Sequence, residues 1–228
     1  MDIAIIGQGN VGLLLYQALC TNHAVTSYGR NAPQEVDLDV DLIIVAVPDS
    51  AVPEVASRYP NTLTVHTAGA VPMLQGPRAG VFYPLYSFSK DMKVNWSKVP
   101  LLLETQSQGD RMVLEDIAES LSDYVYWINS SEREQLHVAA VMVNNFTNHM
   151  YTLAEEYCKE RELPFEVLHR IMLQGPTKAV QYGPKKAQTG PAVRGDKGTI
   201  KKHMETLGDS ELAALYQHIS DSIQKHHS

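Results

Sequence analysis

The first twelve residues contain the feature that most constrains the fold. An apolar run over residues 2–6 stops at a glycine and opens into the sequence Gly7-x-Gly9-x-x-Gly12. The run is short and rich in isoleucine, as in a buried central strand, and the residues after Gly9 suit a helix. Strand, glycine turn and helix form the context that a dinucleotide-binding fingerprint requires. The alternative is a glycine turn that serves packing alone.

Each glycine of this fingerprint has its own expected role. Gly7 would permit the tight turn, Gly9 would let the backbone approach a pyrophosphate, and Gly12 would let the helix lie close to the strand. The helix N-terminus would offer free N–H groups and a partial positive charge to the phosphates. The residues of this segment that we expect to bind a cofactor are Gly7, Gln8, Gly9, Asn10, Val11 and Gly12.

The end of the second predicted strand indicates which dinucleotide is bound. That strand covers residues 24–28, and an NAD site usually places an acidic residue directly after it to bind the ribose 2′-OH. This chain has Arg30 there. A guanidinium suits a 2′-phosphate and stacks on adenine, so we expect NADP rather than NAD. The alternative is that Arg30 is a solvated loop cation.

The third and fourth predicted strands supply further candidates. The third, over residues 41–48, ends at Val47 and Pro48, which we expect to lie beneath the cofactor. The fourth, over residues 63–66, ends at His66, at the edge where doubly wound sheets bind ligands. A histidine there could exchange a proton near neutral pH, or it could simply be satisfied by backbone groups.

The alternation of strands with helices or crossovers continues to residue 128 and then stops. It predicts an α/β fold, with an N-terminal Rossmann-type, mostly parallel sheet followed by an all-α C-terminal domain. We therefore expect a dinucleotide-binding domain over residues 1–129 and a helical dimerisation and substrate domain over residues 130–228.

A long helix is predicted over residues 132–161, which contain neither glycine nor proline. The pattern Ser131-x-x-Glu134 is a possible capping box for its start. Residues 138–143 are apolar on every side, so we expect a helix that is buried on most of its surface. We also expect this helix to be shared across the interface of a homodimer.

Polar residues follow one line of this helix. At about 100° per residue, His137, Asn144 and Asn148 share a line, with Asn145 beside it. A polar stripe inside a buried helix must find partners, which could be a substrate and the nicotinamide amide or merely neighbouring backbone. His137, Asn145 and Asn148 are therefore candidate catalytic residues.

A segment rich in glycine, proline and basic residues interrupts the helical half at residues 182–198. Such a loop inside an all-helical region suggests a site. Arg194 could bind a carboxylate of the substrate with two hydrogen bonds. Asp196 could cap the next helix, predicted over residues 199–207, or orient Arg194.

Composition limits the partners and the compartment. A net charge of −7 with a pI of about 5.7 argues against a nucleic-acid partner. Two distant cysteines, Cys20 and Cys158, indicate neither a disulfide framework nor a zinc site, so we expect no metal and a reducing, cytoplasmic location. No apolar run approaches the roughly 20 residues of a membrane helix, and no signal-type leader precedes the first strand.

Several motifs occur in an order that carries a family resemblance. The chain resembles the family with an N-terminal Rossmann-like domain and a C-terminal helical domain of unknown function, and the resemblance covers essentially the whole chain. Its most specific mark is the sequence Thr-Gly-Pro-x-x-Arg-Gly-Asp. The motifs are Gly7-x-Gly9-x-x-Gly12, Val47-Pro48-Asp49, His66-Thr-Ala-Gly69, residues 83–88, the polar helix over residues 139–149, and Thr189–Asp196.

This family is similar in layout to pyrroline-5-carboxylate reductase, ketopantoate reductase and 6-phosphogluconate dehydrogenase. The resemblance implies NADP-linked hydride transfer, a substrate cleft between the domains, and dimers. It assigns no role to Tyr83, because the family pattern has histidine at that position. The long helix also lacks the lysine general acid of the hydroxyacid dehydrogenase relatives, so their mechanism does not carry over.

The sequence thus favours an NADP-dependent oxidoreductase that acts on a small, anionic C=O or C=N compound. His66 or His137 would donate the proton, and Arg194 would anchor the substrate. One alternative is a non-catalytic NADP-binding sensor or scaffold dimer. Another is a flavin- or deazaflavin-dependent reductase, which shares the fold.

Overall fold

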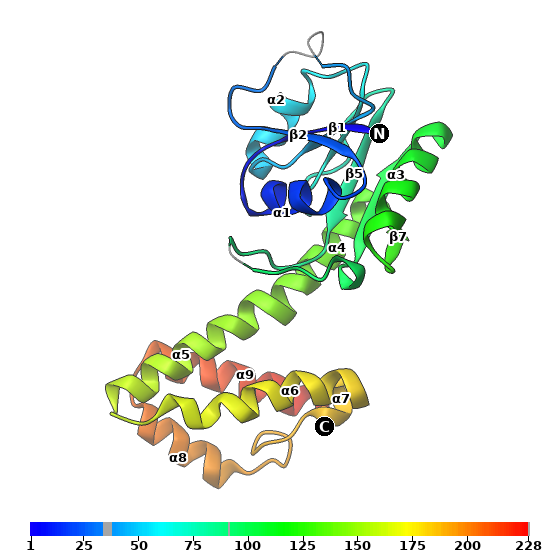
Figure 1. The fold of residues 1–228 in the computed structure, drawn as a ribbon. Coiled ribbons are helices and arrows are strands. Elements are labelled where there is room, and N and C mark those ends of the chain that lie inside the picture. Colours follow the sequence, from blue (N-terminus) through cyan, green and yellow to red (C-terminus); the bar gives the residue numbers. More distant parts are fainter. Residues whose placement is uncertain (34–37, 91, 228) are drawn as a thin grey trace. The chain divides into compact units, whose positions relative to one another are not determined.

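The structure, a computed structural model, describes residues 1–33, 38–90 and 92–227. By their contacts the residues form two compact units, Met1–Asn145 and Phe146–Ser228. The first unit is α/β and the second is built of helices, which confirms the predicted fold class (Figure 1). The sequence places the domain boundary at 129/130, whereas the contacts keep the first part of the long helix with the sheet.

A seven-stranded sheet forms the first unit. Its order is β2-β1-β3-β4-β5-β6-β7, and every neighbouring pair is parallel except β5 with β6. Strands β1, β3 and β4 are almost wholly buried, and β1 and β3 are apolar apart from Asp2, as expected for the centre of a parallel sheet. The strands are β1 (Asp2–Ile6), β2 (Ala24–Tyr28), β3 (Leu42–Val45), β4 (Leu63–His66), β5 (Ala79–Pro84), β6 (Leu101–Thr105) and β7 (Val125–Trp127).

Helices α1 (Asn10–Leu19), α2 (Val52–Ala56) and α3 (Gln108–Leu121) pack against the strands of this unit (Figure 1). Helix α3 begins at a side-chain cap, because the Ser107 hydroxyl accepts a hydrogen bond from the Asp110 N–H. The main core gathers buried residues from the strands, α1 and α3, with Leu15, Leu42 and Phe82 fully buried.

The long helix begins with α4 (Ser130–Ala140). Its capping box uses Asn129 and Glu132 rather than the predicted Ser131 and Glu134, so the helix starts two residues earlier than expected. Asparagine is as good an N-cap as serine, and a glutamate three residues later closes the box equally well in either register. The sequence therefore offered two overlapping boxes.

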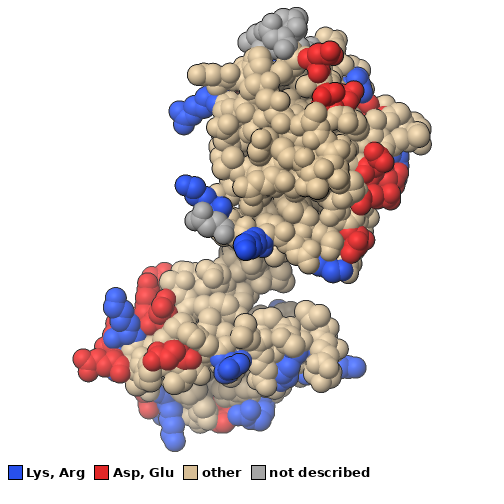
Figure 2. Space-filling model, in the orientation of Figure 1, with Lys and Arg blue, Asp and Glu red and all other residues tan. Residues whose placement is uncertain are grey.

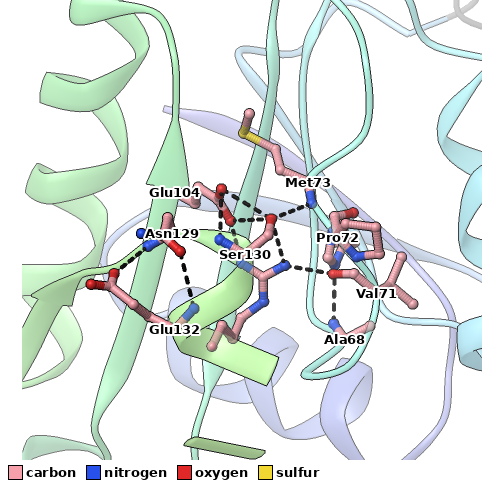
Figure 3. A network of polar contacts seen from close by, with 10 residues as sticks. Ala68, Val71, Pro72, Met73, Glu104, Asn129, Ser130 and Glu132 are labelled. Carbon is pink, nitrogen blue, oxygen red and sulfur yellow. Dashed lines mark hydrogen bonds and ion pairs between the residues drawn. The ribbon is translucent and has the colours of Figure 1, made fainter. Parts of the chain in front are cut away.

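A buried ion pair fixes the first turn of α4 to the sheet (Figure 3). Arg133 is 1% exposed, and its guanidinium pairs with the Glu104 carboxylate of β6. The same guanidinium donates to the Val71 carbonyl at 2.5 Å, in the segment that follows β4. Ser130 donates from its N–H and its hydroxyl to Glu104, and its hydroxyl accepts from the Met73 N–H at 2.8 Å.

This network lies over one row of the sheet. Register pairs His66 with Val81 and Val81 with Glu104, so the three residues share a row across β4, β5 and β6. Residues paired in this way project to the same face of a sheet, and Tyr83, two residues after Val81, projects to that face as well. Sheet register thus brings His66, Tyr83 and Glu104 to the face that α4 covers.

A π-helical segment, η4 (Val141–Phe146), continues the helix into α5 (Thr147–Glu160). A π-turn accommodates an extra residue, so side chains beyond it no longer follow the line predicted for an unbroken α-helix. The predicted burial of this helix is also wrong for the chain taken alone. Val138 and Val143 are 52% and 75% exposed, because no other part of the described chain covers them.

The second unit is helical throughout its regular structure. Beyond α5 it contains α6 (His169–Tyr182), α7 (Pro184–Ala187), α8 (Lys197–Leu207) and α9 (Glu211–His227). No helix in the described part of the chain is long and apolar enough to cross a membrane.

On the face drawn in Figure 2, acidic and basic side chains are scattered singly and in small groups, so no large patch of one charge marks a docking surface on that face.

We expect Arg133→Met to lower the free energy of unfolding by about 3–5 kcal/mol, because it leaves the Glu104 carboxylate without its buried partner. The double variant Arg133→Met/Glu104→Gln should recover part of that loss. Urea denaturation measures both. The matched control is Lys98→Met, which breaks the exposed pair with Asp123 and should change the free energy of unfolding far less. Equal losses at the two sites would contradict the structural role of the buried pair.

Candidate functional site

A cavity of about 650 Å³ opens at the carboxyl ends of β1, β2 and β3. The sheet order reverses there, since β2 lies on one side of β1 and β3 on the other. Open α/β sheets bind ligands at such a switch point. The residues from these three strand ends that line the cavity are Gly7, Gln8, Gly9, Gly29, Arg30, Ala46, Val47 and Pro48.

The fingerprint glycines fit the roles predicted for them. Gly7 has a φ of +122°, and a Cβ there would lie 2.1 Å from the Ala46 carbonyl oxygen. A Cβ on Gly12 would lie 2.0 Å from the Gly7 oxygen, so only glycine lets α1 pack this close to the turn. Around Gly9, by contrast, a Cβ would meet nothing within 4 Å. Gly9 therefore faces open space, as close approach of a phosphate requires.

Helix α1 leaves its N-terminal N–H groups available. Gly9 is its N-cap, no side chain caps it, and its first turn holds no acidic residue. The partial positive charge of the helix is therefore not neutralised by the described residues nearby. The Asn10 side chain donates to the Phe88 carbonyl at 3.2 Å, and Val11 packs against the core, so these two residues hold the turn in place. The backbone around Gly9 fits the pyrophosphate of a dinucleotide.

Two arginines line the same cavity. Arg58, after α2, pairs with Glu54 at 2.6 Å. Arg30 makes no ion pair with any residue that the structure describes. It follows β2 directly, where an acidic residue would serve a ribose hydroxyl. Arg30 is thus the arginine of this cavity that forms no ion pair with a described residue.

A second cavity of about 730 Å³ lies within the first unit, between the segment after β5 and α4 with η4. Its walls include Tyr83, Tyr86, His137, Asn144 and Asn145. Both asparagines belong to η4. Of the predicted catalytic residues, the structure therefore brings together His137 and Asn145.

His137 meets a residue to which the sequence assigned no role. The Tyr83 hydroxyl lies 3.0 Å from Nδ1 of His137, and the rings meet edge to face with centroids 6.1 Å apart. Burial raises the pKa of Tyr83, and the negative charge of Asp49 raises it further. The Tyr83 hydroxyl therefore stays protonated near neutral pH and can either donate or accept a hydrogen bond.

Helix and strand spacing place this contact. His137 follows Arg133 by four residues, or about 6 Å along a helix. Tyr83 follows Val81 by two residues, or about 6.6 Å along a strand. The ion pair of Arg133 with Glu104 fixes α4 over the row that contains Val81. His137 lies one helical turn beyond Arg133, and it therefore lies over Tyr83.

His66 occupies a different environment. It is 1% exposed, its Nδ1 accepts from the Ala68 N–H at 3.2 Å, and its Nε2 lies 3.2 Å from the Pro72 carbonyl oxygen. An N–H on one nitrogen and a carbonyl on the other fix the neutral tautomer that carries its proton on Nε2. Burial, with the nearby Arg133 charge, lowers the pKa of His66 to about 4. The geometry thus matches the backbone-satisfied alternative for this residue.

The other two predicted residues belong to the second unit. Asn148 is exposed on α5, and Arg194 is exposed in the turn before α8. Asp196 caps α8, as predicted, by accepting from the Thr199 N–H and hydroxyl. These bonds hold the pKa of Asp196 below its usual value.

Sequence reasoning assigned no role to Tyr83, Glu104 or Arg133. Tyr83 occupies a position where the family pattern has histidine. That a motif of the family includes this position was a signal that its residue lies at the functional site. Glu104 and Arg133 gave no local signal, since a charged residue near a strand end or in a first helical turn is usually solvated. Their pairing depends on sheet register.

We expect acid to destabilise the protein partly through His66. Its pKa is about 4 in the folded protein and about 6.5 when unfolded, so the unfolded chain binds more protons between these values and stability is lost as the pH falls from about 6.5 to about 4. From pH 7 to pH 5, the wild type should lose about 2 kcal/mol more free energy of unfolding than His66→Gln. Urea denaturation at the two pH values measures this difference, and identical losses would refute it.

Comparison with known proteins agrees with this architecture. A solved structure from Bacteroides fragilis, described as a "putative NADP oxidoreductase", is 35% identical, with 98% of each chain covered and a TM-score of 0.87. Pyrroline carboxylate reductase of Plasmodium falciparum with NADP bound matches at 11% identity, 100% coverage of both chains and a TM-score of 0.60. An imine reductase variant of Myxococcus stipitatus with NAD⁺ matches at 15% identity, 99% and 94% coverage and a TM-score of 0.65.

The last two likenesses show the shared fold, and their cofactors include both NADP and NAD. No curated protein matches the chain in sequence. Residues 99–223 match the family model described as a domain of unknown function, DUF2520. With more than half of its length within that model, the chain belongs to the DUF2520 family of Rossmann-fold proteins.

Proposed function

We propose that this protein is an NADP-dependent oxidoreductase that acts on a small, anionic C=O or C=N compound. The observation that carries the proposal is the cavity at the switch point, which both the open backbone at Gly9 and the Arg30 side chain line. A phosphate-binding turn, and one strand away a cation that forms no ion pair with any described residue, suit a dinucleotide that carries a 2′-phosphate. The 35% identical Bacteroides fragilis protein supports the same reading.

The residues that would hold the cofactor follow from this cavity. Gly7, Gly9 and Gly12 shape the turn, and the N–H groups of α1 bind the pyrophosphate. Val47 and Pro48 form the wall at the end of β3, and Arg30 binds the 2′-phosphate. When bound, NADPH would supply the hydride for reduction of a C=O or C=N group, and the proton for its oxygen or nitrogen would come from a residue of this chain.

His137 is the better proton donor of the two histidines. Both nitrogens of His66 are occupied by backbone groups, and with a pKa of about 4 it holds no excess proton at neutral pH. His137 lines the 730 Å³ cavity, and its described hydrogen bond uses Nδ1 alone, which leaves Nε2 for a ligand. Asn145, in the same wall, can bind a polar group of the substrate.

Asn148 and Arg194 remain predicted substrate ligands from the second unit. Association into a homodimer through the C-terminal helices also remains part of the proposal. It is supported by exposed apolar side chains on α6, where Ile171, Leu173 and Val180 are 63%, 67% and 89% exposed. Apolar surface of this extent is typical of an interface.

We expect Arg30→Ala to weaken NADPH binding by about 10- to 100-fold, because one charge-assisted interaction with the 2′-phosphate is lost. NADH binding should change by less than about threefold, since NADH lacks that phosphate. Titration of nicotinamide fluorescence measures both affinities. Lys98→Ala, a surface cation outside the cavity, is the control. Wild-type protein that binds neither nucleotide, or binds NADH more tightly, would overturn the cofactor assignment.

Turnover separates the enzyme from a sensor. With NADPH bound, a panel of 2-oxo acids and carboxylated cyclic imines should include a compound that oxidises it, followed at the nicotinamide absorbance. Arg194→Ala should then raise the KM for that compound at least about tenfold while the NADPH affinity stays within about twofold. Tight NADPH binding without turnover on any panel member would favour the sensor.

A further inference from the structure

Gly69 makes room for the contact between Tyr83 and His137. It follows β4 by three residues and is buried. A Cβ built on it would lie 2.5 Å from Nδ1 of His137 and 2.9 Å from the Tyr83 hydroxyl oxygen. Its φ is not positive, so the backbone itself does not demand glycine. Glycine is required here for space: the side chain of any larger residue would collide with the two hydrogen-bonded atoms.

The two histidines of this face have partners of opposite kinds. His66 is held between a fixed donor, the Ala68 N–H, and a fixed acceptor, the Pro72 carbonyl, which together accommodate one neutral tautomer. The Tyr83 hydroxyl can rotate: it donates to Nδ1 of a neutral His137 and accepts from the Nδ1–H of a protonated one. His137 thus keeps its hydrogen bond in both charge states, and His66 does not.

We propose that Tyr83 is the positioning residue for His137. Its hydroxyl, admitted by Gly69, holds Nδ1 and leaves Nε2 as the nitrogen that bonds a ligand in the 730 Å³ cavity. The role in proton donation rests on the proposed function. The hydrogen bond itself does not, so it can be tested in the protein without substrate.

Acylation of histidine by diethylpyrocarbonate tests the contact directly, because the reagent attacks an unprotonated ring nitrogen. In this proposal the Tyr83 hydroxyl donates to Nδ1 of neutral His137, so that it covers the Nδ1 lone pair and the ring proton is on Nε2. Tyr83→Phe keeps the ring and removes only the hydroxyl. We expect its His137 to react about fivefold faster than in the wild type, the factor that a typical neutral hydrogen bond provides. Peptide mass spectrometry gives the rate, normalised to exposed His218.

Three further variants make the result specific. Gly69→Ala should raise the rate at His137 as Tyr83→Phe does, because its methyl group displaces the two atoms from each other. Gly76→Ala adds a methyl group that meets only Ala79, at 3.6 Å, and should leave the rate unchanged. Tyr86→Phe removes a hydroxyl from the same cavity and should also leave it unchanged. Circular dichroism checks that each variant is folded.

An unchanged rate in both Tyr83→Phe and Gly69→Ala would overturn the proposal, as would an equal increase in Tyr86→Phe. If one variant fails to fold, the other decides. NADPH titration of the same proteins keeps the two claims apart, since Tyr83→Phe should bind NADPH within about twofold of the wild type. If the wild type fails to bind NADPH, the proposed function is refuted. The positioning role of Tyr83 is still tested by the acylation rates.

Discussion

The pairing of Arg133 with Glu104 is the interaction on which the first unit depends. It joins α4 to β6 in a place that excludes water, where an unpaired guanidinium or carboxylate would be costly. The bonds to Ser130 and to the Val71 carbonyl tie the segment after β4 into the same network. One cluster therefore sets where the helix lies and fixes the loop beneath it.

Much of the first unit could be predicted because its signals are local. The glycine fingerprint, the apolar strands and Arg30 lie within short stretches whose geometry follows from covalent structure and burial. The structure confirms the strands, the mostly parallel sheet and the turn at Gly7. The roles of the cofactor residues stay predictions, although six of them line one cavity: Gly7, Gln8, Gly9, Arg30, Val47 and Pro48.

The remaining features depend on register between distant segments. Whether His66 or His137 can take up a proton is decided by the atoms opposite each ring. Those atoms come from distant segments, so the residues that flank each histidine in the sequence do not reveal them. Tyr83 reaches His137 only because helix and strand advance by similar distances from the Arg133 row. The π-helical segment could not be predicted from the periodicity of the sequence. The order of residues is the same in an α-helix and in a π-helix, and only the side of the helix to which each side chain points differs.

The strand order also sets the distance between Arg30 and Tyr83. Arg30 follows β2, and Tyr83 lies on β5, which is four strands away across β1, β3 and β4. With neighbouring strands about 4.8 Å apart, the two positions are separated by about 19 Å across the sheet. A mononucleotide is too short to reach from one to the other. A single ligand that contacted both positions would therefore have to be an elongated molecule, whatever individual hydrogen bonds it formed.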